Sequence, residues 1–91
     1  MNYIITKTPD FFFHLIDQIN FCQLEDMILP EVLAIDTETT ELKPILGDIF
    51  AIQIGTGVDN YLIHCYDKNY VPQDVFPYLK DKLLIGHNIT F

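Results

Sequence analysis

Asp36 and Glu38 follow an aliphatic run, Val32 to Ile35, and their type and spacing suit metal chemistry. Residues i and i+2 of a β-strand point to the same face. Both carboxylates should therefore project together from the carboxyl end of a strand that is covered on both faces. Two carboxylates so close repel each other, and a divalent cation would relieve that repulsion. The alternative is a strand that simply ends in a polar turn.

The composition limits the classes of function. The chain of 91 residues has a formal charge of −8 and contains neither arginine nor serine. Without serine, serine-nucleophile hydrolysis is excluded. An acidic domain repels polyanions, so a nucleic-acid function would require metal ions, local contacts or a basic neighbouring domain.

The cellular location and the state of the cysteines are predicted from sequence features that the chain lacks. No apolar run is long enough to span a bilayer, and no export signal is recognisable, so we expect a cytoplasmic protein, or a viral protein acting in the host cytoplasm, without membrane contact. Cys22 and Cys65 are too few for a disulfide framework and are expected to be reduced and buried. His64 beside Cys65 could form half of a metal site, but no second pair completes it.

The elements that would position the carboxylates form a mixed α/β sheet. A first strand, Tyr3 to Thr6, precedes a helix that starts at Thr8-Pro9 and carries an apolar stripe. The later elements are the Asp36 strand, strands 49–54 and 61–65 as a hairpin, a helix over 71–82 with proline tolerated only near its first turn, and a strand at 83–86. Residues 24–31 and 42–48 are expected to be connecting segments. The last strand should lie parallel to the Asp36 strand, as a crossover requires.

Two motifs in this order resemble the DEDD-type 3′–5′ exonuclease domain, especially the proofreading domain of family A DNA polymerases. The first motif, Asp-x-Glu followed by Thr and then Leu, is matched by Asp36, Glu38, Thr39 and Leu42. The second, Asn-x-x-(Phe/Tyr)-Asp, is matched by Asn88 to Phe91, where the sequence stops. The resemblance covers residues 1–91 and implies an RNase H-like fold, a mixed sheet flanked by helices and truncated after its fourth main strand.

The resemblance also implies roles for these residues. Asp36 would bridge two Mg²⁺ or Mn²⁺ ions, and Glu38 would bind the ion that activates water. The backbone near Thr39 would meet the 3′ end of a single DNA strand. Leu42 would wedge against the last bases, and Asn88 and Phe91 would help to form the single-strand pocket. The alternatives are that Leu42 and Phe91 are ordinary core residues and that Asn88 is a helix N-cap after the last strand. His87 is expected in a solvated loop.

The departures from the family concern what should follow Phe91. The family uses four carboxylates, and this sequence supplies only the first two. Residues 1–91 are therefore expected to be the N-terminal part of one exonuclease domain, inactive alone, whose C-terminal remainder and polymerase domain are missing. Two alternatives stay open: a non-catalytic RNase H-like remnant acting as an interaction or nucleic-acid-binding module, and a different RNase H-like nuclease.

Overall fold

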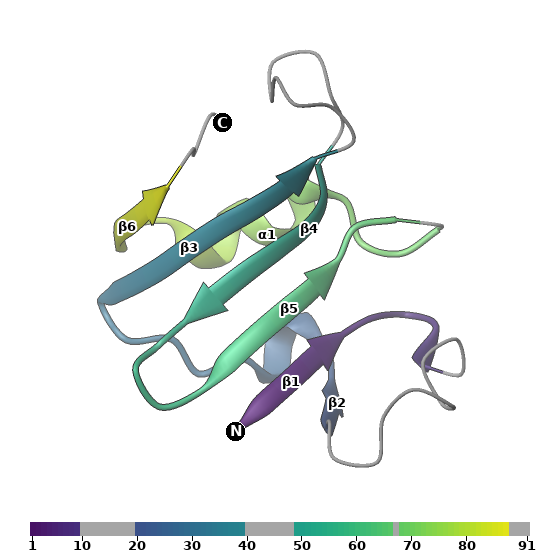
Figure 1. The fold of residues 1–91 in the computed structure, drawn as a ribbon, viewed down its shortest axis with the longest axis horizontal. Coiled ribbons are helices and arrows are strands. Elements are labelled where there is room, and N and C mark those ends of the chain that lie inside the picture. The colour runs from purple at the N-terminus through teal and green to yellow at the C-terminus, as the bar shows by residue number, and fades with distance from the viewer. Residues whose placement is uncertain (10–19, 40–48, 67, 88–91) are drawn as a thin grey trace.

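The computed structural model describes residues 1–9, 20–39, 49–66 and 68–87. Its centre is a mixed sheet of six strands in the order β2-β1-β5-β4-β3-β6 (Figure 1). The strands are β1 (Asn2–Ile5), β2 (Asn20–Cys22), β3 (Val32–Thr39), β4 (Ile49–Gly55), β5 (Asn60–His64) and β6 (Leu83–His87). A 3₁₀ turn, η2 (Leu24–Asp26), and one helix, α1 (Pro72–Leu79), complete the described elements.

The pairing of the strands confirms the α/β class and most of the predicted elements. β3, β4 and β5 are antiparallel neighbours, so the 49–54 and 61–65 segments do form a hairpin. β6 lies parallel to β3, as expected for a strand that arrives after a helix. β1 lies parallel to both β5 and β2.

The helix α1 is shorter than predicted. It begins with Pro72 at its first position, where a missing N–H costs nothing, and Asp74 caps its first turn by accepting a hydrogen bond from the Val71 N–H at 2.9 Å. It ends at Leu79 rather than near Lys82. Pro77 lies inside the helix, beyond the first turn, near which alone proline is expected to be tolerated. A proline there removes one intrahelical hydrogen bond, which fits a helix that ends two residues later.

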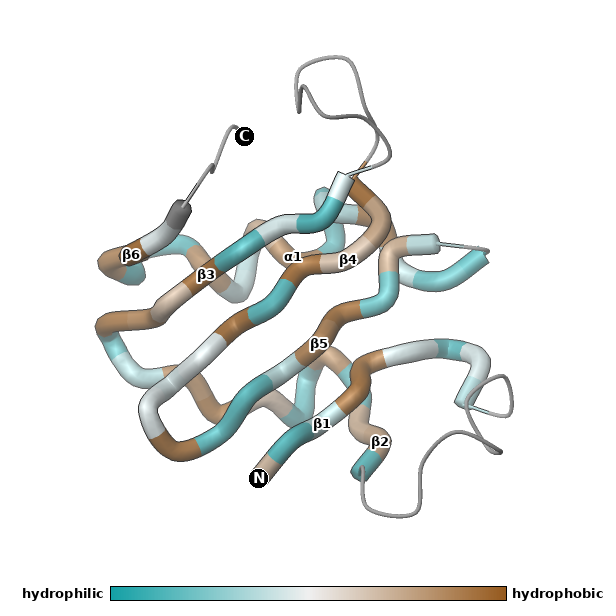
Figure 2. Tube along the Cα trace, viewed as in Figure 1, coloured by the Kyte–Doolittle hydropathy of each residue, from teal (hydrophilic) through white to brown (hydrophobic). Residues whose placement is uncertain are grey.

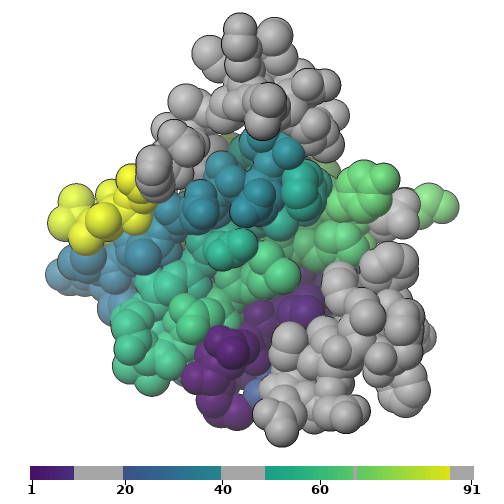
Figure 3. Space-filling model, viewed as in Figure 1, coloured from purple at the N-terminus to yellow at the C-terminus, as the bar shows by residue number. Residues whose placement is uncertain are grey.

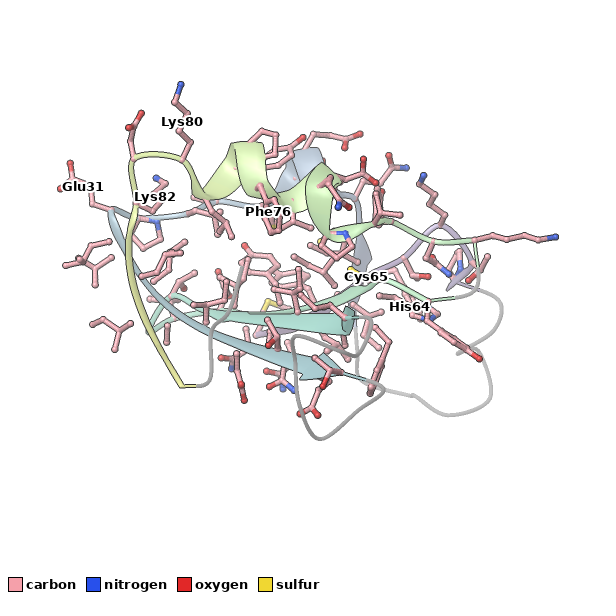
Figure 4. The ribbon with its side chains drawn as sticks, turned by 90° about the horizontal axis from the view of Figure 1, so that it is seen from above. Glu31, His64, Cys65, Phe76, Lys80 and Lys82 are labelled. Carbon is pink, nitrogen blue, oxygen red and sulfur yellow. The ribbon has the colours of Figure 1, made fainter. Side chains whose placement is uncertain are left out.

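One face of the sheet carries the apolar core, under α1 and η2 (Figure 4). The fully buried side chains are Ile5, Leu33, Ile52, Ile54, Ile63 and Val75. We call the opposite face the open face; it is turned toward the viewer in Figures 1 and 3. The described segments contain no helix that is both long and apolar enough to cross a membrane.

Several predicted features lie outside the described residues. These are the helix expected after Pro9, the 42–48 loop, and the motif from Asn88 to Phe91. Strand β2, by contrast, was not predicted, and it occupies the edge of the sheet beside β1.

Candidate functional site

Asp36 and Glu38 both lie in the carboxyl-terminal half of β3. The residue types explain the strand: Val32, Leu33 and Ile35 are branched aliphatics that suit a pleated surface. β3 has a neighbour on each side, β4 and β6, so its backbone is held within the sheet rather than at an edge. Asp36 therefore projects from a stretch of β3 that is paired on both sides, whereas Glu38 lies where the described residues pair β3 with β4 alone.

The side chains of β3 alternate between the two faces of the sheet. Leu33 and Ile35 are buried on the core face, whereas Ala34, Asp36 and Glu38 are exposed. The tube of β3 is mostly brown in its first half and turns to teal and white toward its carboxyl end (Figure 2), the half to which Asp36 and Glu38 belong. The two carboxylates share the open face, with Cα atoms roughly 6.6 Å apart at ordinary strand spacing.

The prediction that this strand is covered on both faces is wrong for the described part of the chain. Val32 is 47% exposed although it begins the aliphatic run. An unbroken apolar run is equally compatible with two kinds of strand. One is covered on both faces; the other is covered on one face and carries small or branched apolar residues at its exposed positions. Only the placement of α1, on a single face, separates these two cases.

Two residues flank Asp36 in the backbone register of the sheet. Gln53 of β4 is its antiparallel partner, and His87 of β6 is its parallel partner. His87 was expected in a loop, and the structure corrects this: it is the last residue of β6. Sequence reasoning did not single out Gln53, although a lone polar residue within the apolar segment from Ile49 to Ile54 was a usable signal.

An irregularity in β4 lies opposite the end of β3. Glu38 pairs with Ala51, but Thr39 pairs with Ile49, so Phe50 is an additional residue in β4. Such β-bulges bend a strand and increase its twist, and they are frequent beside active sites. The bulge changes the pairing register beside Glu38 and Thr39, at the carboxyl end of β3. Thr39 itself is half-buried.

The described surroundings of the two carboxylates leave oxygen atoms available to a cation. One Asp36 oxygen accepts a hydrogen bond of 2.9 Å from the Thr37 N–H. Neither carboxylate forms an ion pair with a lysine of the described residues; the one ion pair among these residues joins the N-terminal amine to Asp59 at 3.2 Å. Carboxylate oxygens are the ligands that Mg²⁺ and Mn²⁺ prefer. Over the same residues, no group of three or more candidate metal ligands gathers.

The structure brings together only part of the predicted site. Asp36, Glu38 and Thr39 lie in sequence along β3. Leu42, Asn88 and Phe91 fall outside the described residues, so their predicted contact with the carboxylates stays a prediction.

His64 and Cys65 do not resemble a metal site. Burial, with a smaller effect of Asp74, raises the pKa of the Cys65 thiol from 9.0 to about 11. Among the described residues, the two side chains belong to no group of three or more candidate metal ligands. The His64 ring contacts the Thr6 hydroxyl, with 3.3 Å between Nδ1 and Oγ1. Figure 4 shows both side chains at the ends of the strands, away from β6.

No protein-family model matches this chain, and no curated protein matches it either.

Proposed function

We propose that this chain is the N-terminal part of a metal-dependent 3′–5′ exonuclease domain of the DEDD type, with an RNase H-like fold. The observation that carries the proposal is the shared exposure of Asp36 and Glu38 on the open face of β3, a strand with a neighbour on either side. Such a pair offers a hard divalent cation two carboxylate ligands from one face of a strand.

The order of the strands supports the RNase H-like part of the proposal. An antiparallel run of three strands, β3, β4 and β5, is followed by α1 and then by β6, which returns parallel to the first strand. A mixed sheet in which the strand preceding the second motif lies parallel to the strand bearing the first is compatible with the RNase H-like fold that the resemblance implies.

In the proposed site, Asp36 would hold two Mg²⁺ or Mn²⁺ ions and Glu38 one of them. The ions would supply an activated water and a counter-charge for the leaving oxygen. Two further carboxylates are expected after residue 91 on the family pattern. The substrate is proposed to be the 3′ end of a single DNA strand, and the protein to act in the proofreading part of a DNA polymerase in the cytoplasm.

The test uses the full-length product of the gene, with an end-labelled single strand, Mg²⁺, and EDTA as a control. The expected result is stepwise shortening from the 3′ end that EDTA and Asp36→Asn both stop. Removing one electrostatic element of a catalytic site commonly costs about 10²–10³ in rate. Asp81→Asn is the matched control, because Asp81 is exposed and has a left-handed backbone (φ 64°) that asparagine also tolerates.

If the wild type leaves the strand intact, or Asp36→Asn shortens it equally well, the exonuclease proposal is wrong. The non-catalytic RNase H-like module would then be the better account of the fold.

A further inference from the structure

A hollow of about 510 Å³ lies on the open face, over strands β1, β5, β4 and β3. This volume is within the range of about 300–1,000 Å³ that is typical of small-molecule sites. Figure 3 shows the face, with side chains of these four strands side by side. The hollow includes Asp36 but extends away from Glu38, toward the beginning of β3.

The floor of the hollow is made by two small residues. Gly55 of β4 is paired with Ala34 of β3, so no bulky side chain rises from the middle of the sheet there. A Cβ added at Gly55 would lie 3.4 Å from Asn60 Oδ1 and 3.7 Å from the Ala34 Cβ, both ordinary contacts. A glycine inside a strand often marks a place where a ligand approaches the backbone closely. At these two residues the floor is therefore low, and a flat ligand can approach the backbone there.

Neutral amides border this floor. Asn60 Nδ2 donates to Asn2 Oδ1 at 3.1 Å, which leaves the Asn2 amino group as a donor and Asn60 Oδ1 as an acceptor. Gln53 carries a further donor and acceptor, and no hydrogen bond joins its side chain to another described residue. Leu62, its partner on β5, adds apolar surface on the same side. The border thus offers both donors and acceptors around an apolar floor.

The charge of the hollow selects among ligands. Asp36 is its one charged lining residue in the described structure, and no lysine lines it. With a net charge of −8 on the chain, an anionic ligand would be repelled. A nucleobase fits these conditions, because it is flat, neutral near pH 7, and carries donors and acceptors on one edge.

We propose that the hollow binds the neutral base of a nucleotide. The choice of a nucleotide rests on the proposed function, but the recognition of the base does not require a metal ion. Base binding can therefore be measured separately from cleavage.

The experiment titrates the ¹⁵N-labelled chain, without metal, with adenosine and with thymidine, and with ribose as a control for the sugar. We expect saturable shifts of the Ala34, Gly55 and Asn60 amides and of the Gln53 side-chain amide. A site with a few neutral hydrogen bonds should have a Kd on the order of 1 mM. Ribose should cause none of these shifts.

Two variants test the geometry. Ala34→Leu fills the floor and should weaken binding at least about tenfold, because the larger side chain would occupy the space of the base. Val32→Leu places the same side chain two residues away on the same face, outside the hollow, and should bind normally. Gln53→Ala removes a donor and an acceptor without filling space and should weaken binding about fivefold.

The inference is overturned if the nucleosides shift no amides of the hollow, or if Ala34→Leu and Gln53→Ala both bind as the wild type does. Cleavage by the full-length protein without nucleoside binding would overturn base binding in the hollow and leave the proposed function standing. Nucleoside binding in a protein that shows no Asp36-dependent cleavage would overturn the proposed function and leave base binding standing.

Discussion

Asn69, in the turn after β5, accepts a hydrogen bond through Oδ1 from the hydroxyl of Thr6 at the end of β1. The same oxygen accepts from the Lys7 N–H at 2.6 Å, and the Asn69 amino group donates to Thr8 Oγ1 at 3.0 Å and to the Tyr66 carbonyl at 2.9 Å. Asn69 is 7% exposed. One side chain thus ties together the carboxyl ends of two parallel strands that are far apart in the sequence.

Asn69→Ala should lower the free energy of unfolding by about 1–3 kcal/mol, because it leaves buried partners without hydrogen bonds. Urea unfolding followed by circular dichroism measures the loss. Asn2→Ala is the control: Asn2 is exposed and makes one amide contact, so a change within about 0.5 kcal/mol is expected. Equal losses in the two variants would contradict a special role for Asn69.

Leu33→Ala and Val32→Ala form a matched pair on β3. Leu33 is fully buried on the core face, so its truncation should cost about 2–5 kcal/mol. Val32 is 47% exposed on the open face, and its loss should cost less than about 1 kcal/mol. The same unfolding experiment compares them. Similar losses would mean that both faces of β3 are covered, and the exposure of Asp36 would then be in question.

The sequence predicted the elements whose patterns are long. The segments that form β3, β4, β5 and β6 were each recognised as apolar runs bounded by turn residues, and local patterns suffice for such runs. β2 was missed because Asn20–Cys22 is three residues long, too short for any periodicity. The parallel pairing of β1 with β5 is non-local, and no run of neighbouring residues encodes it.

The candidate site was predictable only along one strand. The i, i+2 spacing of Asp36 and Glu38 identifies their common face, because strand geometry fixes it. Which face that is, and what lies beside it, depends on register. The placement of Gln53 and His87 next to Asp36 arises from pairings that join three separate segments.

Mn²⁺ should bind weakly at Asp36 and Glu38. With two carboxylate ligands from the described residues, the dissociation constant should be on the order of 1 mM, since affinity of hard-ion sites grows with ligand charge and number. Paramagnetic broadening of amide signals should centre on residues 36–38 and extend to Gln53, the cross-strand partner of Asp36. Asp36→Asn should remove the broadening, and Asp81→Asn should not. Broadening centred on another part of the chain would contradict the site.

Cys65 should react slowly with alkylating reagents. Burial raises the pKa of its thiol to about 11. At pH 8 its thiolate fraction should be about a hundredfold below that of an ordinary thiol with a pKa of 9.0. In Cys22→Ala, the rate of iodoacetamide addition by intact mass reports Cys65 alone, and the urea-unfolded chain supplies the ordinary rate. Equal rates in the folded and unfolded chains would contradict the burial.

The same shift makes stability depend on pH. Because folding raises the pKa of the thiol, folding favours its neutral form. The resulting stabilisation is fully present below pH 9.0 and is lost as the pH rises through about 11. Cys65→Ala should reduce the loss of stability between pH 9.0 and about 11. The substitution also removes packing contacts, which lowers the stability by the same amount at every pH. Burial also raises the pKa of Tyr3 and Tyr70, so these residues contribute a loss of the same sign in both proteins.

The chain of residues 1–91 should self-associate through β6 and the adjoining end of β3. β6 lies at the edge of the described sheet, and Leu83 and Ile85 are 63% and 61% exposed. Leu83 pairs with Val32, itself 47% exposed, so these apolar side chains form a continuous strip on the open face. An unpaired edge beside an exposed apolar strip favours association.

Sedimentation velocity over a range of concentrations measures this association, and salt identifies its cause. The charge of −8 on each copy opposes contact, so raising the salt concentration should strengthen association that is driven by apolar contact. Ile85→Lys should abolish it, because a charged side chain on an edge strand blocks pairing. Val58→Lys is the control: Val58 is 80% exposed but lies in the β4–β5 turn, away from the strip. A strict monomer at high salt and high concentration, or equal effects of the two lysine variants, would show that the strip does not drive association.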